Sequence, residues 1–72
     1  MDDTVLDLTI KTFMKEIRDR LDQAAAIGKA ADACAEAGSC TKAVELSMDL
    51  EQLLYEATTL INSASLLNRI LR

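Results

Sequence analysis

An unbroken heptad pattern in the C-terminal half of the chain constrains the fold most strongly. Apolar residues recur there at intervals that alternate strictly between three and four: Ala43, Leu46, Leu50, Leu53, Ala57, Leu60, Ala64, Leu67 and Leu71. This spacing places them on one stripe of an α-helix and is typical of a helix that packs along its whole length against another helix. It predicts a helix over residues 41–71.

The N-terminal half carries a similar but less regular stripe. Its members are Leu6, Ile10, Phe13 or Met14, Ile17, Leu21, Ala24, Ile27 or Gly28, Ala31, and Cys34 or Ala35. Their recurrence every three to four residues predicts a helix over residues 4–37. Gly38 is suited to end that helix in the left-handed conformation, so a turn over residues 38–40 joins the two helices. Residues 1–72 then form a single helical domain.

The composition supports an all-α fold. The chain has no proline and only two glycines, and its strand-forming residues never alternate with polar ones over a run. If the chain reverses at the turn, Gly28 faces Leu50, Ala24 faces Leu53 and Leu21 faces Ala57. Because large residues then face small ones, the sequence predicts an antiparallel two-helix hairpin. The alternative is three helices with a break at Gly28, since glycine inside a helix costs about 1 kcal/mol relative to alanine.

A second apolar line beside the first predicts a further neighbour. We assign five residues to this protein interface: Leu6, Phe13, Ile27, Leu54 and Ile61. Exposing all of them would leave a large apolar patch, and two-fold dimers are the commonest oligomers, so we expect the hairpin to dimerise into a four-helix bundle. In its pattern this architecture resembles that of ROP-like proteins, in which two helical hairpins form such a dimer.

Two cysteines flank the predicted turn. Cys34 and Cys40 are close enough in sequence for a disulfide, provided that their Cα atoms lie within about 7 Å. A reducing cytosol would keep both as free thiols. A disulfide or redox pair is the alternative.

The charge distribution argues against nucleic acid and membranes as partners. The chain carries 8 basic and 12 acidic side chains, a net charge of −4. The basic residues Lys11, Lys15, Arg18 and Arg20 each have an acidic residue four positions away, which predicts a self-neutralised face. The N-terminus is acidic, and no apolar run reaches the roughly 18 residues of a membrane span, so we expect a cytoplasmic protein.

Enzymatic chemistry has no support in the sequence. There is no histidine, no glycine-rich phosphate loop and no nucleophile with an evident base, and we expect neither a cofactor nor a metal. The sequence therefore predicts a small non-enzymatic protein that acts through protein–protein association, as a homodimeric assembly, adaptor or regulatory module. Two alternatives are a chaperone-like subunit for a heterologous helical protein and a ROP-like nucleic-acid-binding hairpin dimer.

Overall fold

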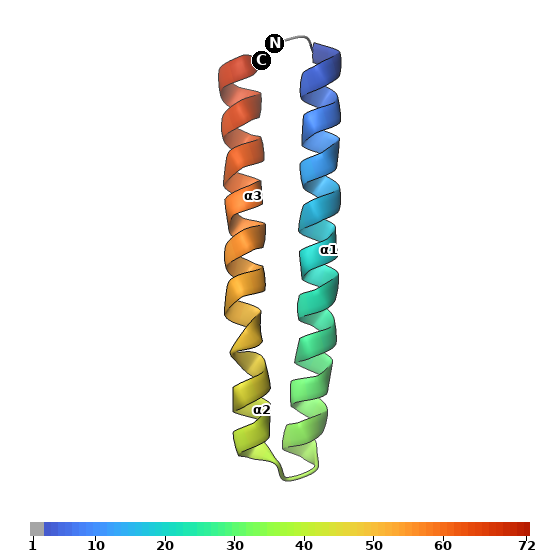
Figure 1. Cartoon of the computed structure of the whole chain (residues 1–72), viewed down its shortest axis with the longest axis vertical. Helices are drawn as coiled ribbons and strands as arrows, with labels where there is room; N and C mark the ends of the chain where they lie inside the picture. The colour runs from blue at the N-terminus through green and yellow to red at the C-terminus, as the bar shows by residue number, and fades with distance from the viewer. Residues whose placement is uncertain (1–2) are drawn as a thin grey trace.

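The computed structural model describes residues 3–72 and shows two long helical arms that run antiparallel (Figure 1). The first arm is α1, Asp3–Glu36, and the second consists of α2, Cys40–Ser47, followed by α3, Asp49–Leu71. All regular structure within residues 3–72 is helical. The predicted all-α hairpin is therefore confirmed, and α1 begins and ends one residue earlier than the sequence predicts.

The turn between the arms depends on Gly38, as predicted. Its φ of +89° lies in the left-handed region, where a side chain would be strained. The amide of Gly38 donates to the carbonyl of Ala35 at 3.0 Å, and the amide of Ser39 donates to the carbonyl of Cys34 at 2.8 Å. This pair of bonds is a Schellman motif, which satisfies the last carbonyls of α1 and reverses the chain.

The helix interruption lies at Met48 and not at Gly28. Helix α1 runs through Gly28 without a break, so the alternative of a break at that residue is wrong. In the second arm the hydroxyl of Ser47 donates to the carbonyl of Val44 at 2.7 Å. That carbonyl is the normal acceptor for the amide of Met48, which instead donates to Glu45 at 3.3 Å. One tightened turn therefore separates α2 from α3, and we propose that the Ser47 bond favours it, since serine side chains that bond back to the backbone often bend helices.

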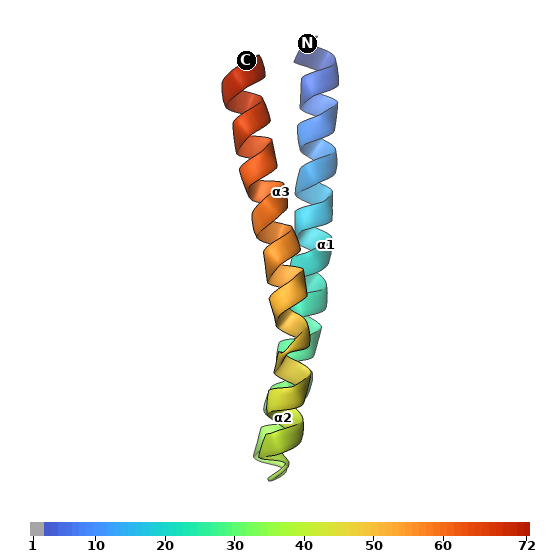
Figure 2. The ribbon, with the colours of Figure 1, turned by 60° about the vertical axis from the view of Figure 1, so that its left-hand side comes forward.

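The arms lie side by side over their full length and are slightly inclined to each other (Figure 2). The chain measures 54 × 15 × 11 Å. Two ion pairs join the arms, Arg20 with Glu56 near the middle and Asp7 with Arg72 at the open end. Residue numbers at these ion pairs sum to 76 and 79, and the predicted pairs Gly28 with Leu50 and Leu21 with Ala57 sum to 78, so the predicted register lies between the two.

The stripe predicted for the second arm is the one that faces α1. All nine of its members are buried or half-buried, and Ala57 and Ala64 are only 3% and 4% exposed. In the described part of the chain, Leu6 and Ile17 are the two other buried apolar residues, and of the four only Leu6 is fully buried. A core of four residues is thin, as expected when each helix contacts a single neighbour.

The stripe predicted for α1 is partly wrong. The spacing of apolar residues places Leu21, and Met14 as the alternative to Phe13, against the second arm, yet Met14 and Leu21 are 48% and 46% exposed. The observed inward residues follow strict intervals of four and three: Leu6, Ile10, Phe13, Ile17, Arg20, Ala24, Ile27, Ala31 and Cys34. We call these residues, with the nine of the second arm, the seam. The seam position predicted for Leu21 is occupied by its neighbour Arg20. Met14 and Leu21 therefore lie on a different surface of α1.

Candidate association interface

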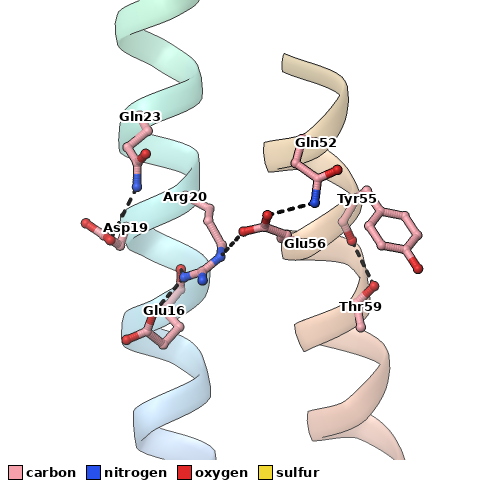
Figure 3. A network of polar contacts seen from close by, with 8 residues as sticks. All are labelled: Glu16, Asp19, Arg20, Gln23, Gln52, Tyr55, Glu56 and Thr59. Carbon is pink, nitrogen blue, oxygen red and sulfur yellow. Dashed lines mark hydrogen bonds and ion pairs between the residues drawn. The ribbon is translucent and has the colours of Figure 1, made fainter. Parts of the chain in front are cut away.

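Arg20 is the one charged residue in the seam, and it organises a polar network across the two arms (Figure 3). Its Nε donates to Oε1 of Glu56 on α3 at 3.0 Å. Its Nη1 donates to the carbonyl of Glu16 at 3.1 Å and to Oε2 of the same residue at 2.5 Å. Gln52 donates to the other carboxylate oxygen of Glu56 at 2.8 Å. The guanidinium is thus held between carboxylates from both arms.

The electrostatics of this network favour its ionised form. Hydrogen bonds from Gln52 and Arg20 lower the pKa of Glu56 below its ordinary value. Hydrogen bonds to Glu16 and Glu56 raise the pKa of Arg20. Because the Arg20 side chain keeps about a quarter of its surface in solvent, the pair adds specificity of register more than stability.

A shallow hollow of about 240 Å³ lies beside the network. It is lined by Arg20, Tyr55, Glu56, Thr59 and Leu60. The ring of Tyr55 points away from α1, and the hydroxyl of Thr59 donates to the carbonyl of Tyr55 at 2.9 Å (Figure 3). The charged groups at this hollow already neutralise one another, so it offers a ligand little uncompensated charge.

Four apolar residues line the opposite side of the hairpin. Met14 and Leu21 on α1 and Leu54 and Ile61 on α3 are each 46–50% exposed. On each arm the two residues are seven apart and immediately follow a seam residue. We call Met14, Leu21, Leu54 and Ile61 the apolar flank. Half-exposed large side chains in this position are typical of a surface that a further helix covers.

Heptad geometry places these four residues on one side of the molecule. Counted from the seam, all four occupy the e position of their heptads, whereas Glu16 and Glu56 occupy the g position. In an antiparallel pair of helices, e positions lie beside e positions and g positions beside g positions. The observed contact of Arg20 with both Glu16 and Glu56 confirms that the two g rows share one side. The apolar flank is therefore the other side.

Gly28 belongs to the same row of α1 as Met14 and Leu21. It is half-buried, and a Cβ atom added to it would meet nothing within 4 Å. Glycine inside a helix costs about 1 kcal/mol relative to alanine, and the hairpin gives no steric reason for it. Gly28 thus leaves a notch in the apolar flank.

The five residues predicted as the protein interface lie in two different environments. Leu6 is fully buried within the hairpin, and Phe13 and Ile27 are half-buried in the seam. Leu54 and Ile61 remain about half exposed and belong to the apolar flank. Sequence reasoning therefore missed Met14 and Leu21 as members of this surface, although strict four-and-three spacing from Leu6 would have found them.

The two cysteines that flank the turn are both free thiols, as expected for a reducing cytosol, where a disulfide or redox pair is the alternative. Cys34 is half-buried at the end of the seam, and Cys40 is exposed at the start of α2. A reversible disulfide between them stays a prediction.

The basic residues of α1 lie on several faces of the helix. Arg18 pairs with Asp22 at 3.8 Å and Arg20 pairs with Glu16, as the spacing predicts. Lys11 and Lys15 are exposed. Nucleic-acid binding through these four residues stays a prediction.

Within residues 3–72 no group of three or more cysteine, aspartate, glutamate or histidine side chains is placed to hold a metal ion. Over the same residues, no helix combines the length and the apolar character that crossing a membrane requires.

Comparison of the chain with known protein families, with curated proteins and with solved structures finds no match.

Proposed function

We propose that this protein is a non-enzymatic association module in which two hairpins pair through their apolar flanks to form a four-helix bundle. The observation that carries the proposal is the line of four half-exposed apolar side chains on one side of the hairpin. The middle of the opposite side holds the Arg20 network, in which one guanidinium binds two carboxylates. Midway along the hairpin, charged groups therefore occupy one side and apolar groups the other, while Ile70, at a g position near the open end, is 66% exposed on the charged side.

The exposed area supports a partner of the size of this chain. The hairpin exposes 5243 Å², whereas a compact monomer of 7.9 kDa exposes about 4400 Å². The excess of about 800 Å² equals the area that one partner contributes to a standard protein interface. The radius of gyration of 16.5 Å also exceeds the roughly 11 Å of a compact domain of this length.

A second copy is the occupant that this geometry favours. The four residues of the flank span about ten residues of helix, or about 15 Å, near the middle of the hairpin, so the flank of an identical hairpin matches it in size. A two-fold dimer covers both flanks at once, and closed two-fold dimers are the commonest oligomers. The resulting bundle has helices of alternating direction, the arrangement in which hairpins pack with short connections.

Sedimentation equilibrium of matched variants tests the proposal. Leu21→Lys places a charge in the apolar flank, and Leu8→Lys makes the same change at a residue of α1 that is 66% exposed and lies on its outer face. We expect the wild type and Leu8→Lys to have twice the 7.9 kDa chain mass and Leu21→Lys to be monomeric at the same concentration.

Two results would contradict the proposal. A folded wild type that stays monomeric over the whole concentration range would leave the flank to a different protein. A Leu21→Lys variant as dimeric as the wild type would show that the copies associate through another surface.

A further inference from the structure

We infer that the two copies pair with their turns at opposite ends, so that α1 packs on α1 of the second copy, with Met14 against Gly28 and Lys11 beside Asp32. This inference rests on the proposed function and specifies its geometry. It follows from the order of residues on the flank and along its border.

The border of the apolar flank carries opposite charges toward its two ends. The border is the row of b positions, which lies beside the e row on the side away from the seam. On α1 it consists of Lys11, Arg18, Ala25 and Asp32, at intervals of seven. The basic pair lies toward the open end of the hairpin, and Asp32 lies toward the turn. When two such rows run in opposite directions, Lys11 of each copy lies opposite Asp32 of the other. Charge complementarity of this kind fixes the orientation of partners.

The same reversal fills the notch at Gly28. Met14, Leu21 and Gly28 are spaced by seven, so a two-fold axis at Leu21 brings Met14 of each copy onto Gly28 of the other. A large flexible side chain then fills a position where the hairpin alone places nothing within 4 Å. This contact would account for a glycine that the single hairpin does not require.

The second arm gives an independent estimate of the axis. Pairing Leu54 with Ile61 of the second copy puts the axis between residues 57 and 58 of α3. Pairing Lys11 with Asp32 puts it between residues 21 and 22 of α1. Residue numbers at the two ion pairs between the arms sum to 76 and 79, and those of the two axis points sum to 79, so the points lie within about three residues, or about 4.5 Å, of one level. One axis therefore satisfies both arms.

The rival arrangement, with both turns at the same end, forms no ion pair between the border residues of the two copies. It packs α1 on α3 of the second copy at equal height. Asp32 then lies near Val44, Lys11 near Ser65 and Arg18 near Thr58. The apolar residues still meet, but no charged residue of the border meets one of opposite sign.

A charge exchange tests the predicted contact between Lys11 and Asp32. These residues are 21 positions apart on one helix, or about 32 Å, so they cannot pair within a chain. We expect Lys11→Glu and Asp32→Lys each to weaken dimerisation about tenfold, since two pairs become repulsive in each dimer. The double variant should restore the wild-type dissociation constant.

Lys15→Glu is the control, because it makes the same charge change on the outer face of α1, and it should leave the dissociation constant close to that of the wild type. A double variant that dimerises no better than the two single ones would overturn the pairing.

A distance measurement tests the orientation with the exposed native thiol near the turn. A spin label on Cys40 of the Cys34→Ser variant reports the separation of the two turns in the dimer by pulsed electron resonance. We expect a separation on the order of the 54 Å length of the hairpin. A dimer with its labels within about 25 Å, or two to three interhelical spacings, would overturn the orientation and leave the proposed function standing. A monomeric mass in the same sample would overturn both.

Discussion

Truncation of Ile17 tests whether the seam carries the stability of the hairpin. Ile17 is 9% exposed and lies between the two arms near the middle of α1. Core Ile→Ala changes cost about 2 to 5 kcal/mol, and a seam between two helices can partly collapse around the missing atoms. The better helix propensity of alanine offsets a few tenths of a kcal/mol. We therefore expect Ile17→Ala to lower the free energy of unfolding by about 2 to 3 kcal/mol.

Urea unfolding followed by circular dichroism measures this change, with all proteins at one concentration because association shifts the midpoint. Leu8→Ala is the matched control on the same helix, since Leu8 is 66% exposed and its truncation should change the free energy by less than about 0.5 kcal/mol. Equal losses in the two variants would refute the assignment of the seam on α1.

Three further predictions concern the turn, the interruption in the second arm and the central ion pair. Gly38→Ala forces a side chain into the left-handed region and should lower the free energy of unfolding by about 1 to 2 kcal/mol in the same urea assay; an unchanged midpoint would contradict the turn. Ser47→Ala frees the carbonyl of Val44, so the amide of Met48 should gain protection from hydrogen exchange, and unchanged exchange would contradict the proposed cause of the interruption. The pKa of Glu56 is lowered in the folded state, so its contribution to stability is present above its ordinary pKa of 4.5 and is lost as the pH falls through the lowered value. Urea midpoints measured from pH 6 to pH 3, a range chosen to span the ordinary carboxyl pKa values, should therefore fall less steeply for Glu56→Gln than for the wild type, and identical slopes would contradict this role.

The second arm could be predicted from the sequence almost completely. Its nine seam residues are all apolar, so their spacing alone identified the face that α1 covers. The end of α1 was also predictable, because Gly38 is the residue that a left-handed helix end requires. The register followed from the length of the turn and the matching of large with small residues.

The face of α1 could be predicted only in part, because Arg20 interrupts its apolar pattern. A search for apolar residues selects Leu21 next to it, whereas the strict spacing from Leu6 leads to Arg20. Arginine can occupy a seam position because its stem is apolar and its guanidinium can reach the rim, where Glu16 and Glu56 bind it. Because this seam position is an arginine, the apolar pattern alone assigns Met14 and Leu21 to the wrong surface of α1.

The interruption at Met48 could not be predicted from apolar periodicity. The stripe of the second arm continues through it unchanged, since Met48 itself keeps a right-handed helical conformation with φ of −63° and ψ of −27°. It coincides with a local hydrogen bond from Ser47, and serine inside a helix makes such a bond in only some of its rotamers.

Oxidation of the two internal methionines tests the account most directly, because it reports, in the wild-type sequence, which surface a partner covers. Met14 on the apolar flank and Met48 on the outer face are 48% and 59% exposed in the single hairpin, so dilute peroxide should oxidise them at similar rates in a monomer. Peptide mass spectrometry at rising protein concentration should show Met14 becoming protected while Met48 continues to react. Equal oxidation of Met14 and Met48 at every concentration would contradict the pairing of two hairpins through the apolar flank.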